Sequence, residues 1–234
     1  MSLLNRFSIL IALAVFSVSI AAAQSSGRDR ETTVEESYLQ QSIENMIIRE
    51  TARASNRDQK LIALAYIGEA IDRGNTSDDV RNTLEFLCLE GTKSVARENG
   101  RVMNNFPDIR WQAVKYLGAI GTEEAKYILL EICQYESEPM VLQEAIKVLG
   151  DIGLNENNET VTIIARVVSR MDSLNPDNLV ALATVDTFEK IAKKNNGINS
   201  SEAIRLLMRI SEGSYIRPVQ DRARQLLADL RRYN

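Results

Sequence analysis

The sequence predicts an all-α protein folded as a right-handed α-solenoid of about five helix pairs, and three observations support this. First, 44% of the 234 residues are hydrophobic while only 6% are aromatic and 4 are proline, a balance that favours helices over sheets. Second, one short pattern recurs along the chain. Third, the segment after each copy carries apolar residues at helical spacing. Helix pairs with one apolar face must stack to bury it.

The first element predicted is a cleavable signal peptide at residues 1–23. Arg6 precedes an apolar run over residues 7–20, and the small residues that end at Ala23 suit cleavage after Ala23. An uncleaved membrane anchor is the alternative, although the run is short for a membrane span. We therefore expect a protein exported to the periplasm or the extracellular space, with no stable membrane span after cleavage.

A flexible leader is expected at residues 24–35, because this stretch is polar and begins with Ser and Gly. The solenoid is expected over residues 36–234. Its apolar periodicity and capping residues predict about ten helices, as follows: 36–53, 58–73, 77–90, 108–120, 122–134, 138–153, 157–172, 177–194, 199–211 and 217–232.

The clearest copies of the recurring pattern are residues 107–121 and 139–153, which align without a gap. In each copy a Pro begins a helix, where its missing N–H costs nothing. Ala113 and Leu117 lie four residues apart on one face, and Gly118 allows another helix to approach closely. Weaker copies keep the same offset around an apolar anchor residue. The five anchors are Ile67, Leu117, Leu149, Phe188 and Leu227.

A second helix follows each of the first four anchors, and its apolar residues superpose on those of the next unit. Their spacing is i, i+4, i+7 and i+8, which is one face of a helix. The four columns are Val80, Leu84, Leu87 and Cys88; Ala125, Leu129, Ile132 and Cys133; Val161, Ala165, Val168 and Ser169; and Ala203, Leu207, Ile210 and Ser211.

With these positions the chain resembles HEAT repeats, in particular the short type of phycobilisome-lyase-like proteins. The best matches to the family pattern are Pro107, Arg110, Ala113, Leu117, Gly118, Ile120 and Gly121. The resemblance covers about residues 56–232, and it implies five HEAT-like helix pairs. Where Glu189 or Ala228 replaces the glycine, we expect a wider approach between helices.

An insertion at residues 91–106 interrupts the repeat and supplies the candidate partner contacts. Lys93, Arg97 and Arg101 make it locally basic, and such insertions sometimes carry a binding function. A solvated loop or an extra helical turn without a role is the alternative. The single Trp, Trp111, is a second candidate, since Trp is a favoured interface anchor, although a packing role is equally compatible with its position.

The two cysteines, Cys88 and Cys133, occupy equivalent positions on second helices of neighbouring units. Packed helices lie about 8 to 10 Å apart, whereas a disulfide requires Cα atoms closer than roughly 7 Å. We therefore predict two buried free thiols.

The residue inventory argues against several classes of function. The chain has no His, the commonest metal ligand and general base, and it has no phosphate-binding loop or Cys-rich cluster. We expect no catalytic, cofactor-binding or metal-binding residues. Loss of Arg6 with the signal peptide leaves 27 basic against 32 acidic residues, a net charge of −5, which disfavours nucleic acid.

The sequence thus predicts an exported, non-catalytic scaffold that binds a protein or peptide in the periplasm or cell envelope. A HEAT-like enzyme of the lyase type is the alternative, by analogy with relatives of that kind. Three matches to the glycosylation acceptor pattern begin at Asn75, Asn158 and Asn199, and they matter only if the host glycosylates exported proteins.

Overall fold

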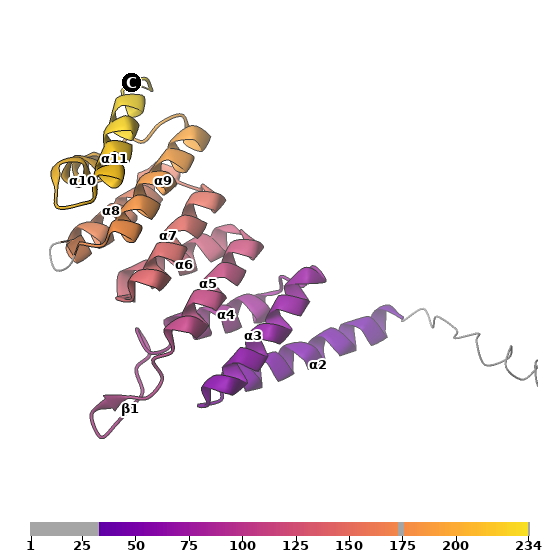
Figure 1. The fold of residues 1–234 in the computed structure, drawn as a ribbon. Helices are drawn as coiled ribbons and strands as arrows, with labels where there is room; N and C mark the ends of the chain where they lie inside the picture. The colour runs from indigo at the N-terminus through magenta and orange to yellow at the C-terminus, as the bar shows by residue number, and fades with distance from the viewer. Residues whose placement is uncertain (1–32, 173–175, 234) are drawn as a thin grey trace, which may run out of the picture. The chain divides into compact units, whose positions relative to one another are not determined.

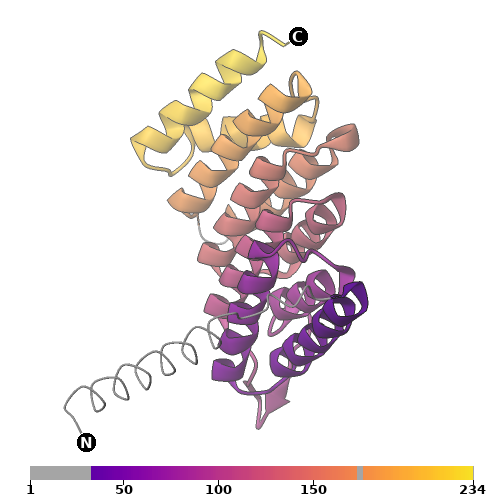
Figure 2. The ribbon, with the colours of Figure 1, turned by 90° about the vertical axis from the view of Figure 1, so that its right-hand side faces the viewer.

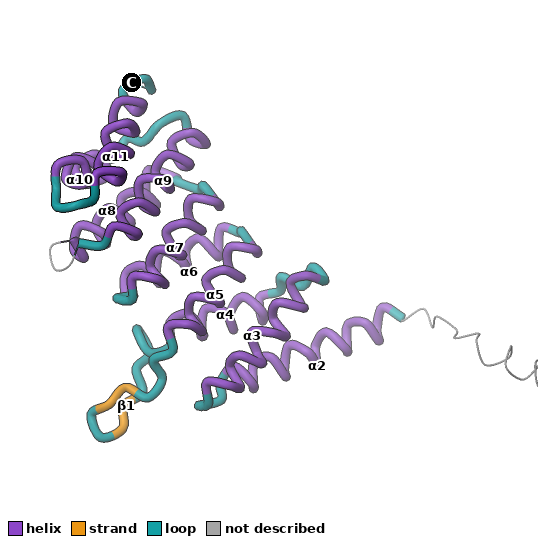
Figure 3. Tube along the Cα trace, in the orientation of Figure 1, coloured by secondary structure: helices purple, strands orange, loops and turns teal. Residues whose placement is uncertain are grey.

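The computed structural model describes residues 33–172 and 176–233. The predicted signal peptide and residues 24–32 of the predicted leader lie outside the described residues. The described part is almost entirely helical (Figure 3). Its α-helices are α2 (Val34–Ala52), α3 (Arg57–Asp72), α4 (Asp78–Leu89), α5 (Pro107–Ile120), α6 (Glu123–Tyr135), α7 (Pro139–Ile152), α8 (Glu159–Asp172), α9 (Asn178–Asn195), α10 (Ser201–Glu212) and α11 (Arg217–Leu230). A 3₁₀ turn, η1 (Glu156–Asn158), and two strands, β1 (Arg97–Glu98) and β2 (Arg101–Val102), complete it.

Each of the ten predicted helices has a counterpart, and the predicted ends differ from the observed ends by at most two residues. The local signals explain this agreement. Pro begins α5 and α7, and the glycines that follow them, Gly121 and Gly153, end the helices in the left-handed conformation. One boundary was wrong: α2 begins at Val34, so the last two residues of the predicted leader are helical.

The chain divides into two compact units, Met1–Ser42 and Ile43–Asn234. In the second unit the helices form two layers (Figures 1 and 2). The first layer stacks α3, α5, α7, α9 and α11 in chain order, and the second layer places α4, α6, α8 and α10 beside one another. One hydrophobic core lies between the layers and extends from Ile48 to Leu230. This is the serial packing of a helical solenoid.

The predicted columns describe the core with few errors. Every column residue on the second helices is buried except Ser169, which is half-buried. The last anchor was also wrong, because Leu226 and Leu230 point into the core while Leu227 is only partly buried. Within the described residues no later unit packs against α11, so the repeat does not fix the rotation of this helix as strictly.

Close approach between first-layer helices depends on glycine at two of the predicted positions. A Cβ on Gly118 would lie 2.8 Å from Val148 Cγ1, and one on Gly150 would lie 2.8 Å from Thr187 Oγ1. At the last junction, between α9 and α11, Glu189 forms an ion pair with Arg222 of α11 instead. A side-chain bridge therefore replaces the glycine contact there.

The insertion between α4 and α5 is a β-hairpin, which corrects the expectation of a plain loop or helical turn. Strands β1 and β2 pair antiparallel, with Glu98 opposite Arg101. The turn residues Asn99 and Gly100 both have positive φ, 48° and 81°. Such an Asn-Gly pair forms the two-residue turn whose twist matches a hairpin. Among the described helices, none combines the length and the apolar character needed to cross a membrane.

Candidate functional site

The hairpin projects from the helical stack (Figure 3). All residues from Lys93 to Met103 are exposed. Three of them carry large apolar side chains, namely Val95, Val102 and Met103. The exposed surface of the hairpin therefore combines apolar side chains with the predicted basic ones.

Backbone and amide hydrogen bonds hold the base of the hairpin. Asn104 Oδ1 accepts from the Ala96 N–H at 2.9 Å, and Asn104 Nδ2 donates to the Ser94 carbonyl at 2.8 Å. Gly91 adopts φ 78°, and a Cβ there would lie 2.4 Å from the Asn104 carbonyl oxygen. Only glycine fits at this entry point, because the two sides of the hairpin meet there.

A buried ion pair on α5 fixes the hairpin to the solenoid. Arg110 donates to both carboxylate oxygens of Glu136, at 2.7 and 3.2 Å, and both side chains are almost fully buried. Its remaining guanidinium nitrogen donates to Asn105 Oδ1 at 2.8 Å and to the Glu90 carbonyl at 3.4 Å. Glu90 and Asn105 flank the insertion, so one side chain holds both of its ends.

A second buried cation reaches the same point from α3. Lys60 Nζ lies 2.7 Å from Glu90 Oε2 as an ion pair, although the two groups are not aligned for a hydrogen bond. Lys60 also donates to the Ala52 carbonyl at 2.8 Å. Buried charges of this kind are tolerated only when paired, and here the pairs join α3 and α5 to the segment that carries the hairpin.

The four predicted contact residues have different surroundings. Lys93 forms an ion pair with Glu131 of α6, and this carboxylate raises the pKa of Lys93, so Lys93 tethers the hairpin to α6. Arg97 and Arg101 lie on the exposed strands, where Arg97 donates to the Gly100 carbonyl at 3.3 Å. Trp111 is half-buried against the core, with Lys115 Nζ 4.5 Å from its ring centroid. The structure thus groups the three basic residues and places Trp111 in the packing of α5.

Sequence reasoning missed the hairpin and its apolar side chains. The signal was present, since Asn99-Gly100 lies between short extended segments and is the strongest short hairpin pattern. The role of Arg110 as the clamp of the insertion could not be predicted, because its partners come from Glu90, Asn105 and Glu136.

A family model of HEAT repeats matches residues 102–170. These residues contain both strong copies of the recurring pattern and run from β2 into α8. The chain contains HEAT repeats. This confirms the resemblance, and the helix pairs on either side of the matched segment continue the same two layers. No curated protein and no solved structure is significantly similar to the chain.

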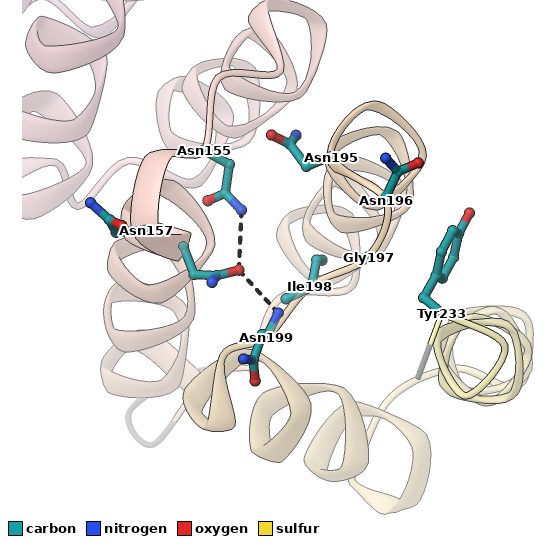
Figure 4. A pocket seen from close by; sticks show the side chains of 9 residues that line it. Asn155, Asn157, Asn195, Asn196, Gly197, Ile198, Asn199 and Tyr233 are labelled. Carbon is teal, nitrogen blue, oxygen red and sulfur yellow. Dashed lines mark hydrogen bonds between the residues drawn. The ribbon is translucent and has the colours of Figure 1, made fainter.

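A polar pocket of about 240 Å³ lies at one end of the HEAT helices, between the loop that contains η1 and the loop after α9 (Figure 4). Asn158 Oδ1 accepts from Asn155 Nδ2 at 3.4 Å and from the Asn199 N–H at 3.0 Å. Two of the three glycosylation patterns thus meet here. The Asn158 amide braces the two loops against each other, so we assign it a structural role.

A groove of about 330 Å³ lies over the first-layer helices α7, α9 and α11. Its polar lining is largely self-paired, because Arg222 donates to Asp186 at 3.0 Å and also bridges to Glu189. The apolar lining includes Leu179, which is exposed. This pairing leaves few polar groups in the groove available for a ligand.

The cysteines of the HEAT units are free and buried, as predicted. Burial raises the pKa of Cys133 to about 12 and raises the pKa of Cys88 as well, so neither thiol is a nucleophile near neutral pH. Within residues 33–172 and 176–233, no three Cys, Asp or Glu side chains are grouped so as to hold a metal ion.

Proposed function

We propose that this protein is an exported, non-catalytic HEAT-repeat scaffold that binds a protein or peptide in the periplasm or cell envelope through its hairpin, residues 91–106. HEAT repeats supply the framework, since stacked helices offer extended surfaces for protein contacts. The observation that carries the proposal is an exposed apolar and basic hairpin whose two ends are clamped by the buried Arg110–Glu136 pair.

The clamp matters because binding costs free energy when it orders a loose segment. Gly91, Asn104 and Arg110 fix the base of the hairpin before any partner arrives. Val95, Val102 and Met103 then supply apolar area, the main source of binding free energy. A preordered apolar tip is a better partner contact than a loop of the same composition.

The charged residues of the hairpin indicate which class of partner it binds. The hairpin carries Lys93, Arg97 and Arg101 against one acid, Glu98, while the chain as a whole is acidic. The partner is therefore a protein or peptide surface with an acidic rim around an apolar depression. Nucleic acid fits poorly, because the net charge of −4 repels a phosphate backbone outside this small patch.

The proposal that the protein is exported depends only on residues 1–23. It can therefore be tested separately from the hairpin. The mature protein recovered from the envelope fraction should begin at Gln24 by mass spectrometry. Recovery of the full-length chain from the cytoplasm would contradict the export half of the proposal and leave the binding half standing.

The hairpin is tested by site-specific photo-crosslinking from position 102 in the native envelope, followed by identification of the crosslinked protein. The double variant Arg97→Glu with Arg101→Glu should lose the crosslink at least tenfold. A matched control reverses two exposed arginines on α8 and α10, Arg166→Glu with Arg205→Glu, and should keep it. Equal yields from both variants, or turnover of a small molecule in an activity screen, would overturn the proposal.

A further inference from the structure

Contacts between successive first-layer helices follow one register. The residue just before each anchor packs on the glycine of the preceding helix: Tyr116 on Gly68, Val148 on Gly118 and Thr187 on Gly150. Val148 and Thr187 are consequently 6% and 1% exposed. Each of these helices therefore carries this residue on the edge that faces the preceding helix, and we call this edge the receiving edge.

In α3 the same position is Tyr66, directly before the anchor Ile67. Within the described part of the chain, no first-layer helix precedes α3. Tyr66 is 41% exposed and Ile62, one turn earlier, is 44% exposed. The receiving edge of α3 is thus an apolar stacking surface without its neighbour.

Helix α2 lies next to the start of α4 and also carries exposed apolar side chains. Asn45 of α2 donates to Ser77 and Asp79 at the start of α4, so its side faces the stack. By helical geometry Ile43, Met46 and Ile47 lie on the opposite side, and all three are exposed. Exposed apolar side chains therefore mark α2 as well as α3.

Once the predicted signal peptide is cleaved, little apolar sequence remains ahead of α2 to cover this edge. Between the predicted cleavage site and α2 lie residues 24–33, which contain no apolar side chain. Residues 24–33 therefore cannot provide an apolar helix face to pack on the receiving edge of α3.

The opposite end of the stack is polar. On α11, Arg224, Ala228 and Arg231 lie along one side of the helix, and all three are exposed. Head-to-tail stacking of two copies would bury these guanidinium groups against Ile62 and Tyr66, a costly desolvation. A pairing of two receiving edges buries apolar surface against apolar surface instead.

We infer that the edge formed by α3 and the second-unit part of α2 is a homodimer interface, in which α3 packs antiparallel on α3 of a second copy about a two-fold axis. Such an isologous contact uses the same patch twice and closes the assembly. The antiparallel arrangement sets Ile62 and Tyr66 of one copy against the same two residues of the other, so apolar surface is buried on both sides.

The test measures molar mass by sedimentation and light scattering over a wide concentration range. It uses the chain without residues 1–23, which keeps the whole core from Ile48 to Leu230. We expect a dimer. A monomer at every concentration would overturn the inference.

The double variant Ile62→Glu with Tyr66→Glu should weaken dimerisation at least tenfold while keeping the helical circular dichroism signal. Its matched control, Gln225→Glu with Ala228→Glu on the polar end, should leave the dimer unchanged. A dimer that survives the first variant would place the interface elsewhere and refute the assignment.

Orientation is tested by oxidation of Tyr66→Cys, since the native thiols are buried. A two-fold contact gives a disulfide-linked dimer from this variant alone. Crosslinking only after mixing with Ala228→Cys would show head-to-tail stacking and overturn the two-fold arrangement.

Discussion

Buried charge is the main residue-scale feature of this solenoid. Lys60, Arg110 and Lys126 have fully or almost fully buried side chains, and each has an acidic partner. Burial opposes the charge of Lys126, yet its hydrogen bond to Glu156 raises its pKa. In all three cases the partner comes from another element, so these pairs join elements rather than stabilise single helices.

The Arg110–Glu136 pair gives the first prediction. Glu136→Gln removes the counter-charge and leaves the guanidinium buried, which should lower the free energy of unfolding by about 3 kcal/mol. Urea denaturation measures the loss. The exposed pair of Arg224 with Asp221 provides the control, and Asp221→Asn should cost far less because solvent screens that pair. Similar losses for the two variants would show that the buried pair is not a clamp.

The buried thiols predict a pH dependence of stability. A thiol of the unfolded chain titrates near pH 8.5, whereas burial raises the pKa of Cys133 to about 12 in the folded protein. Above roughly pH 8.5 the unfolded chain loses a proton that the folded chain keeps, so stability falls as pH rises toward the folded pKa. Below that pH the contribution is complete.

The expected slope is up to about 1.4 kcal/mol per pH unit for each buried thiol. Denaturation midpoints of the wild type and of the variant Cys88→Ala with Cys133→Ala, measured between about pH 8 and pH 10.5, should therefore converge as pH rises. Tyr215, whose pKa burial also raises, is present in both proteins and does not affect the comparison. Parallel pH profiles would contradict the assignment.

At the scale of elements, glycine decides how closely the first-layer helices approach. Gly118→Ala places a methyl group 2.8 Å from Val148 Cγ1, and a β-branched side chain within a helix cannot rotate away easily. The variant should lose about 1 to 2 kcal/mol of stability, despite the better helix propensity of Ala.

A double-mutant cycle with Val148→Ala tests the cause. The methyl groups removed from Val148 make room for the new one, so the two substitutions together should cost less than their sum. Gly68→Ala is the matched control, because the atom it meets is the Tyr116 hydroxyl at the end of a long side chain. Strict additivity of the first pair would mean that the helices do not depend on this contact.

For the whole molecule, α11 closes the C-terminal end of the stack. It buries Val219, Ala223, Leu226 and Leu230 against α9 and α10 and turns a polar face outward. A chain that ends at Gly213 should lose at least about 4 kcal/mol of stability, from the apolar area left exposed. It should also bind a hydrophobic dye.

The control for this truncation removes only residues 232–234, of which Arg232 and Tyr233 are exposed and follow the end of α11. This shorter truncation should leave the unfolding midpoint unchanged. If both truncations behaved alike, α11 would not be the closing element of the solenoid.

The sequence by itself determined the helices, their order and almost the whole core. These features depend on local chemistry: periodic apolar residues, Pro at helix starts and Gly after helix ends act over a few neighbouring residues. The same patterns repeat along the chain, namely the Ala113–Leu117 offset and the columns that hold Cys88 and Cys133. An alignment that is correct in one unit therefore also predicts the buried residues of the next unit. Only at α11 did the predicted register differ from the structure, because Leu226 and not Leu227 is buried.

Tertiary structure alone decided which residues of the candidate site act together. Lys93, Arg97 and Arg101 were predicted as a basic insertion, but only the fold shows that Lys93 is held by Glu131 while the two arginines lie on a hairpin. The exposed edge at Tyr66 is equally invisible in the sequence, because its residues match those of buried edges. The physical reason is the same for both: exposure and pairing depend on neighbours that are distant in the chain, and local sequence patterns do not reveal them.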